Sequence, residues 1–132
     1  MESQFDISVI IPVYNAQDYL QECIDSILHQ TKDRIEIVIV NDGSTDRSGD
    51  IIARNAQLHS SITVIEQSNQ GVGAARSRGF LSAKGEYIGW IDADDMAKPD
   101  MFEELYRIAK TEDADYVYCN YEFFPQDRKS VV

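Results

Sequence analysis

The sequence contains little cysteine and little histidine, with two of each among 132 residues. Cys23 and Cys119 lie far apart, and neither belongs to a CxxC pair. Cys23 falls on the apolar stripe of a predicted helix, so we interpret it as a buried free thiol, which suits a reducing compartment. His29 and His59 have polar neighbours and form no recognisable metal pair or catalytic dyad, so we expect both at the surface.

Long apolar runs and a leader sequence are also absent. No stretch approaches the roughly 18 consecutive apolar residues of a membrane-spanning helix. Residues 1–12 lack the basic start and the apolar stretch of a signal peptide. The sequence therefore predicts a cytoplasmic protein with no membrane span.

Positive charge is scarce. Twelve lysines and arginines face 23 aspartates and glutamates, which gives a formal net charge of −11. This balance argues against nucleic acid or anionic lipid as a direct partner. It leaves a phosphorylated ligand open, because a bound metal ion can supply positive charge locally.

What the sequence does contain is a regular alternation of apolar runs and amphipathic segments. Two runs rich in β-branched residues, at 8–11 and 36–40, indicate strands buried on both faces of a parallel sheet. The alternation predicts right-handed βαβ units in an α/β fold. Strands are expected at 7–13, 35–40, 62–66, 87–91 and 116–121, and helices at 16–29, 46–58, 71–83 and 99–110.

Residues 1–132 are expected to form one domain, with a core at about 7–121 and a tail at 122–132. The tail loses periodicity and suggests that the chain is one part of a longer protein. Asn15 is expected to cap the first helix, and Pro99 to occupy the first position of the fourth.

The strand expected at 87–91 ends in an acidic triplet: Asp92, Asp94 and Asp95. Like charges packed so closely repel one another unless a cation lies among them. Oxygen ligands favour a hard divalent ion such as Mg²⁺ or Mn²⁺. Because ligands of open α/β sheets bind beyond the carboxyl ends of the strands, the triplet predicts a metal site that faces a phosphate-bearing ligand.

Three other polar loops follow strands in the same way, at 12–15, 41–46 and 68–76. In a parallel sheet all four loops emerge at one edge and converge on one cleft. Asp42 could accept a hydrogen bond from a ring N–H of a base, or could lie in a plain strand-to-helix turn. Tyr14 could stack on a base, or could be a half-buried tyrosine on the rim.

The third loop contains two glycines that open a helix, followed by Arg76 one turn later. Gly71 and the N–H groups at this helix start could attract phosphate, with Arg76 adding a charged contact. A flexible loop and a helix start are the simpler interpretation. Trp90, at the end of the fourth strand, is interpreted as a residue of the core or of the floor of the cleft.

Taken together, five motifs closely resemble those of the family 2 glycosyltransferases, which have the GT-A fold, a Rossmann-like nucleotide-sugar-binding α/β domain. Any one motif is weak, but five in the right order and spacing are specific, and the resemblance covers about residues 7–121. The motifs lie at 9–15, 39–46, 69–76, 85–88 and 92–95.

The resemblance implies roles on the nucleotide side of the site. Asp42 matches the aspartate that holds the base, and Tyr14 lies at the stacking position. Arg76 matches an arginine beside the nucleotide. The remaining nucleotide-sugar-binding residues carried over from these motifs are Pro12, Val13, Asn15, Gly71 and Ala93.

The resemblance also implies that 92–94 is a DxD motif. Asp94 would bind the Mn²⁺ or Mg²⁺ that bridges the diphosphate. Asp92 would lie by the ribose or support the metal shell, and Asp95 would be a neighbour of the sugar or the acceptor.

The implied activity is inverting transfer of a sugar from a nucleotide-diphosphate sugar, with a UDP-sugar favoured, to the hydroxyl of a sugar or lipid-linked acceptor, as in polysaccharide biosynthesis. In these enzymes the general base lies in a second half of the protein, which also shapes the acceptor site. The chain is therefore expected to stop before the acceptor region, and to bind the donor without transferring its sugar. The alternative is a non-catalytic nucleotide-sugar-binding module, which turnover with metal present would distinguish. A receiver domain or an aspartyl-phosphate phosphatase fits poorly, because 66–68 and 12–15 lack the aspartates these would need.

Overall fold

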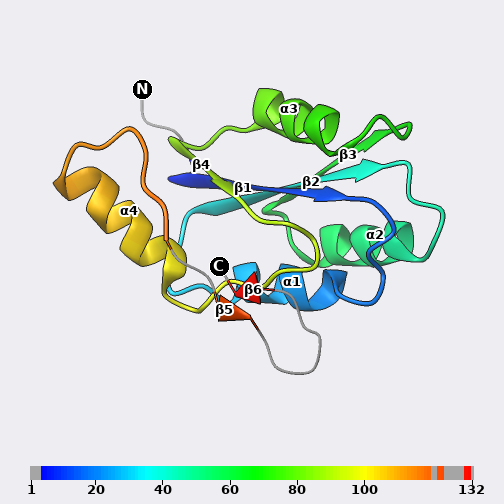
Figure 1. The fold of residues 1–132 in the computed structure, drawn as a ribbon, viewed down its shortest axis with the longest axis horizontal. Helices are drawn as coiled ribbons and strands as arrows, with labels where there is room; N and C mark the ends of the chain where they lie inside the picture. The colour runs from blue at the N-terminus through cyan, green and yellow to red at the C-terminus, as the bar shows by residue number, and fades with distance from the viewer. Residues whose placement is uncertain (1–3, 120–121, 124–129, 132) are drawn as a thin grey trace.

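The computed structural model describes residues 4–119, together with the backbone of 122–123 and 130–131. Its centre is a parallel sheet of four strands in the order β3-β2-β1-β4 (Figure 1). The strands are β1 (Ile7–Val13), β2 (Ile35–Asp42), β3 (Ile62–Gln67) and β4 (Tyr87–Trp90). The helices are α1 (Leu20–Leu28), α2 (Ser48–Leu58), α3 (Val72–Ser82) and α4 (Met101–Thr111).

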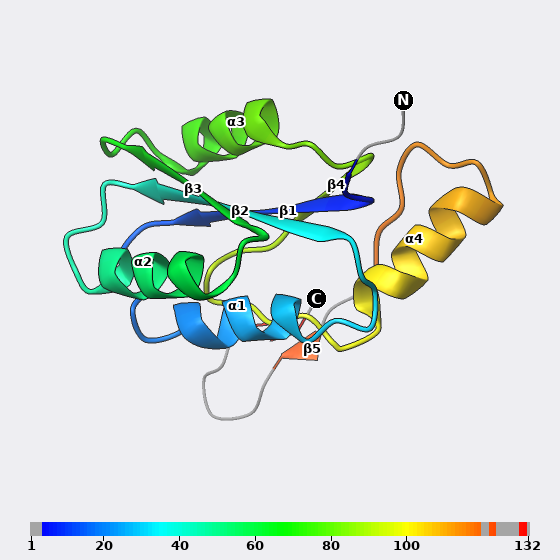
Figure 2. The same cartoon turned by 180° about the vertical axis from the view of Figure 1, so that it is seen from behind.

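Helices cover both faces of this sheet, with α1 and α2 on one face and α3 on the other (Figures 1 and 2). Alternate residues of the strands supply the two cores. Val9 and Ile11 belong to the cluster on the α1 side, whereas Ile10 and Val38 pack with Ala75 of α3. Two apolar faces require two helical layers, so the predicted α/β fold with a parallel sheet is confirmed.

The last helix packs against β4, the edge strand. The rings of Tyr87 and Tyr106 meet edge to face, with centroids 5.8 Å apart. Gly89 lies under Phe102, since a Cβ on this glycine would come within 2.7 Å of the ring. β4 therefore accepts α4 because its middle residue has no side chain.

Pro12 is compatible with a central strand because of where β4 stops. The carbonyl of Ile10 accepts a hydrogen bond from Ile91 on the β4 side, and residues two apart in a strand point the same way. Pairing with β4 ends at Ile10–Trp90, so the N–H that Pro12 lacks would have no partner there.

Helix starts differ from the sequence prediction. α1 begins at Leu20 rather than at 16, and α4 begins at Met101, so Pro99 does not hold the first helical position. Asn15 does not cap α1, because it has φ 48° and its side chain binds the loop after β2. A cap residue that has a tertiary partner is not free to start its own helix.

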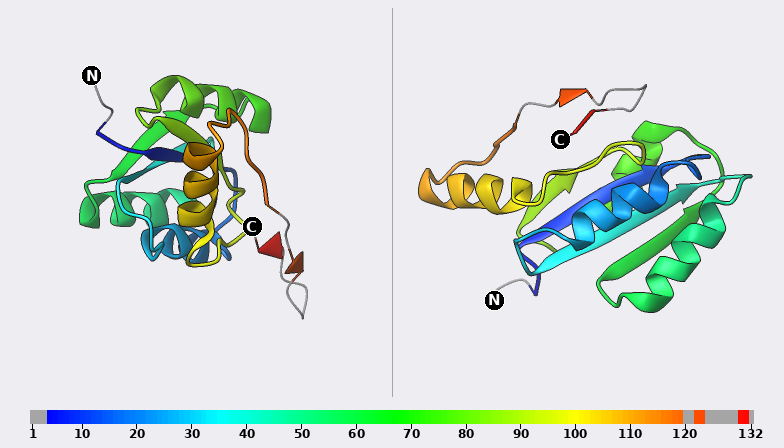
Figure 3. Two further views of the ribbon diagram at one scale, coloured as in Figure 1. Left: turned by 90° about the vertical axis from the view of Figure 1, so that its left-hand side faces the viewer. Right: turned by 90° about the horizontal axis from the view of Figure 1, so that it is seen from below.

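The predicted fifth strand is not a strand over residues 116–119, and 120–121 lie outside the described residues. Tyr116 and Tyr118 are 79% and 77% exposed, and they line a pocket beside β4 and α4 instead of pairing with β4. β5 (Glu122–Phe123) and β6 (Ser130–Val131) instead form an antiparallel pair outside the main sheet (Figure 3). Most of the predicted tail lies outside the described residues. In the part of the chain that the structure describes, no helix has the length and apolar character needed to cross a membrane.

A buried carboxylate ties the amino-terminal edge of the sheet together. Glu36 is 1% exposed and accepts hydrogen bonds from Ser8 Oγ at 2.7 Å and from the backbone N–H of Lys84 at 3.0 Å. The N–H of Gly85 donates to the same Ser8 hydroxyl at 2.7 Å. This network fixes the connection between α3 and β4, and hence the position at which β4 enters the sheet.

The close approach at this connection gives a test of the fold. A Cβ on Gly85 would lie 2.5 Å from the backbone nitrogen of Ser8, so Gly85→Ala must displace the backbone of β1 or of the connection. We expect the unfolding free energy to fall by about 1–3 kcal/mol. The matched control is Gly73→Ala in α3, which meets nothing within 4 Å and should be neutral or slightly stabilising. Equal stability of the two variants in urea unfolding would contradict this packing.

Candidate functional site

The acidic triplet forms a compact turn just beyond β4, here called the acidic turn (Asp92, Asp94 and Asp95). The N–H of Asp95 donates to the carbonyl of Asp92 at 3.0 Å, which closes the turn. One carboxylate oxygen from each residue lies within 4.8 Å of the others. Three clustered carboxylates provide the oxygen donors that a hard divalent cation prefers, so these residues fit such an ion.

Cys23 of α1 lies beneath the acidic turn and supports it. Its thiol donates to the carbonyl of Asp92 over 3.5 Å. Burial, helped by the three nearby carboxylates, raises the pKa of this thiol well above its usual range. The thiol therefore stays protonated and acts as a weak donor, which confirms the buried free cysteine. Ala93 is also buried, which leaves the flanking carboxylates to face outward.

Asp42, the last residue of β2, holds the loop between β3 and α3. Its Oδ1 accepts from Gln67 Nε2 and from the N–H of Gln70, both at 2.8 Å, and its Oδ2 accepts from the N–H of Gly71 at 3.0 Å. The hydrogen bond from Gln67 and the two backbone donors outweigh burial and lower the pKa of Asp42 below 3.8. Asp42 is 3% exposed, and these three hydrogen bonds use three of the roughly four acceptor sites of its carboxylate.

The loops after β1 and β2 are interlocked through Asn15. Its Oδ1 accepts from the N–H groups of Thr45 at 2.8 Å and Asp46 at 3.3 Å, and its own N–H donates to Ser44 Oγ at 3.0 Å. Burial raises the pKa of Asp46, but donors from Ser48 and Gln17 outweigh it and keep that pKa low. Asn15 therefore shapes the site by joining two loops.

The loops after β2 and β3 are also in close contact. Gly43 has φ 73°, and a Cβ there would lie 2.7 Å from the backbone nitrogen of Asn69. Only glycine combines this left-handed conformation with such an approach. Three of the four strand-end loops are thus fixed to one another.

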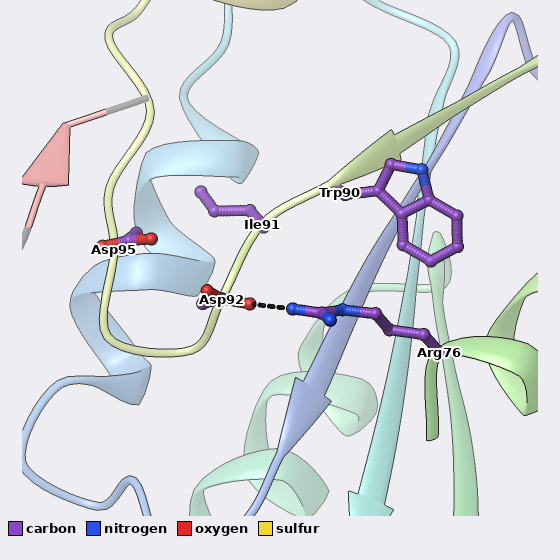
Figure 4. A pocket seen from close by; sticks show the side chains of 5 residues that line it. All are labelled: Arg76, Trp90, Ile91, Asp92 and Asp95. Carbon is purple, nitrogen blue, oxygen red and sulfur yellow. Dashed lines mark hydrogen bonds and ion pairs between the residues drawn. The ribbon is translucent and has the colours of Figure 1, made fainter. Parts of the chain in front are cut away.

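The fourth loop is linked through Arg76, which reaches from α3 to Asp92. Nη2 of Arg76 lies 3.0 Å from Asp92 Oδ1, and both side chains are about half exposed. They line an open hollow of about 380 Å³ with Trp90, Ile91 and Asp95 (Figure 4). Trp90 was expected in the core or in the floor of the cleft; it is 46% exposed and lines this hollow, so it belongs to the cleft side of the sheet and not to the core.

The structure brings most of the predicted site residues to one edge of the sheet. Asp42 ends β2 and the acidic turn follows β4, and both strands run parallel to β1. Pro12 and Val13 are buried in β1, whereas Tyr14 is 52% exposed at its mouth. Sequence reasoning missed Gln67 and Gln70, the partners of Asp42. An amide that directly follows a strand was the available signal, but no local pattern reveals its partner.

Comparison with known proteins identifies the family. The sequence matches Glycosyl transferase family 2 over residues 8–131. The chain belongs to this family. It is 46% identical over 115 residues to EpsH of Bacillus subtilis, named as a glycosyltransferase, covering 87% of this chain and 33% of EpsH. It is also 46% identical over 116 residues to the glycosyltransferase GlyG of Streptococcus pneumoniae, covering 87% of this chain and 38% of GlyG.

Solved structures agree on the GT-A fold. Residues 1–349 of S. aureus TarS, crystallised with UDP-GlcNAc, superpose with a TM-score of 0.86 at 24% identity, over 92% of this chain and 36% of that fragment. The mannosyltransferase PcManGT of Pyrobaculum calidifontis, in complex with GDP-Man and Mn²⁺, gives a TM-score of 0.73 at 27% identity, over 96% of this chain and 37% of that protein. This family 2 chain therefore spans about a third of the length of such relatives.

The anchoring role of Asp42 predicts a pH-dependent effect of mutation. Asp42→Asn leaves fewer acceptors for Gln70 and Gly71, so the unfolding free energy at pH 7 should fall by about 1–3 kcal/mol. Because the folded pKa lies below the unfolded value, the carboxylate stabilises the fold above about pH 4 and loses this effect as pH falls through the folded pKa. The difference between wild type and variant should thus shrink below pH 3.8.

The control for this experiment is Asp18→Asn, which removes one exposed carboxylate that accepts none of these loop hydrogen bonds. It should change the unfolding free energy by less than about 0.5 kcal/mol. A stability difference for Asp42→Asn that stays constant from pH 7 to pH 3 would show that the charge of Asp42 does not hold the loop.

Proposed function

We propose that this family 2 domain binds the donor of a glycosyltransferase, a nucleotide-diphosphate sugar, through a divalent metal ion. The observation that carries the proposal is the position of the acidic turn, at the same sheet edge as Asp42 and Tyr14. In open α/β sheets this edge is where ligands bind, next to the point where strand order reverses. Here the reversal lies between β1 and β4.

The nucleotide end of the donor would lie between the first three loops. Tyr14 presents an exposed ring on which a base can stack. Asp42 has one lone pair left to accept a ring N–H, which favours uracil or guanine over bases whose ring nitrogen is an acceptor. TarS binds UDP-GlcNAc and PcManGT binds GDP-Man, and both bases carry such a ring N–H. Of these we favour a UDP-sugar.

The diphosphate end would face the acidic turn. Asp94 and Asp92 would hold Mn²⁺ or Mg²⁺, and Asp95 would lie near the sugar or the acceptor. An ion bound there would offset the negative charge that builds on the leaving diphosphate. Arg76 would give a charge-assisted hydrogen bond to a phosphate oxygen.

The reaction proposed for the whole protein is inverting transfer to the hydroxyl of a sugar or lipid-linked acceptor, as in polysaccharide synthesis in the cytoplasm. Attack from the face opposite the leaving diphosphate inverts the anomeric carbon, and a carboxylate must take the hydroxyl proton. The chain spans 33% of EpsH and 38% of GlyG, and we assign that base to the part of the whole protein that this share does not cover. For residues 1–132 alone, donor binding is the proposed activity.

Donor binding should depend on Asp94. Asp94→Asn removes a ligand charge from the acidic turn, so UDP should lose metal-dependent affinity by at least about tenfold, by analogy with the cost of disturbing metal-ligand shells. Titration calorimetry of UDP with and without MnCl₂ measures this effect. The exposed Asp100, beyond the acidic turn, offers a matched control, and Asp100→Asn should bind UDP as wild type does.

The assignment fails if Asp94→Asn binds UDP as tightly as wild type in the presence of Mn²⁺. It also fails if Mn²⁺ does not affect UDP binding to the wild-type protein.

A further inference from the structure

Arg76 and Asp92 form an ion pair inside the proposed donor site. Arg76 projects from α3 and Asp92 belongs to the acidic turn, so the pair spans the hollow beside Trp90 (Figure 4). The guanidinium occupies one carboxylate oxygen of Asp92, at 3.0 Å. That residue is one of three whose oxygens gather closely enough to share a cation.

The pair is weak enough to exchange. Both side chains are about half exposed, at 43% and 55%, so water and salt screen their attraction. Exposed pairs of this kind contribute only about 0.2–1 kcal/mol. A multivalent ligand can therefore displace the guanidinium, which otherwise places a positive charge beside the acidic turn.

We propose that Arg76 is an internal counter-ion that competes with the divalent cation for Asp92 and releases it when the nucleotide diphosphate binds. The inference rests on the proposed function, because it assumes a metal at the acidic turn and a phosphate nearby. Arg76 acts here as a positioning residue. Its transfer from carboxylate to phosphate leaves Asp92 free for the cation.

The start of α3 is anchored at the same edge of the sheet. The N–H of Gly71, just before α3, is bound to Asp42, so the helix that carries Arg76 is fixed to the end of β2. Only the arginine side chain has to move. Nucleotide and metal therefore bind cooperatively for two reasons: the diphosphate supplies ligands to the metal, and it removes a competitor.

The test measures the binding of Mn²⁺ alone, through the electron paramagnetic resonance signal of the free ion. The titration is run at about 150 mM salt, where the Debye length is about 8 Å and distant surface charges are screened. Arg76→Gln should bind MnCl₂ about two- to fivefold more tightly than wild type, because the competing pair is lost. The matched control is Arg78→Gln, which removes the same charge from an exposed residue of α3 with no ion pair among residues 4–119. It should bind Mn²⁺ as wild type does. Arg76→Lys keeps the charge and should lie closer to wild type than Arg76→Gln.

Repeating the titration with saturating UDP measures the cooperativity. The factor by which UDP tightens Mn²⁺ binding should be smaller in Arg76→Gln than in wild type, and linkage requires the same reduction in the effect of Mn²⁺ on UDP. An Arg76→Gln variant with wild-type Mn²⁺ affinity, or an equal gain in Arg78→Gln, would overturn the inference and leave the metal site intact. Failure of wild type and all variants to bind Mn²⁺, with or without UDP, would overturn the proposed function as well.

Discussion

The buried carboxylate of Asp42 is the contact on which the site depends. It ends β2 and accepts hydrogen bonds from the side chain of Gln67 and the backbone of Gln70 and Gly71, so one side chain fixes the start of α3. α3 in turn carries Arg76, which reaches the acidic turn. Bonds to a charged acceptor are roughly twice as strong as neutral ones, which suits a group that must hold a glycine-containing loop in place. The base side and the metal side of the site are thereby joined through one helix.

Neighbouring side chains and hydrogen bonds stabilise the acidic turn. Three carboxylates whose oxygens lie within 4.8 Å of one another repel, and Arg76 offsets part of this repulsion through its ion pair with Asp92. Cys23 donates to the carbonyl of Asp92, and the N–H of Asp95 closes the turn. These two contacts hold the backbone of the turn in place. We regard the acidic turn as a preorganised site. The repulsion between its carboxylates is already present in the folded protein, and the binding of a cation reduces this repulsion.

The sequence predicted the four main strands and helices well, because β-branched runs at 8–11 and 36–40 can only be buried strands in a chain of this composition. It predicted the shared edge of Asp42 and Asp94 because both lie where strands of a parallel sheet end. It failed where tertiary contacts override local preference. Asn15 has a good capping side chain but binds Thr45, thirty positions away, and residues 116–119 have β propensity but do not pair with β4, the edge strand. For Trp90 the sequence left the core and the floor of the cleft open, because hydrophobicity alone does not distinguish the two positions.

The central claim is that one ligand bridges Asp42 and the acidic turn, and nuclear magnetic resonance of the ¹⁵N-labelled chain tests it directly. UDP with Mg²⁺ should shift the amide signals of Tyr14, Gly43 and Gly71 together, with one common affinity. Replacing Mg²⁺ by paramagnetic Mn²⁺ should broaden the signals of 92–96 most strongly. The account is contradicted if UDP and metal perturb separate regions with independent affinities, or if Mn²⁺ broadens signals at the opposite edge of the sheet, around Ser8 and Glu36.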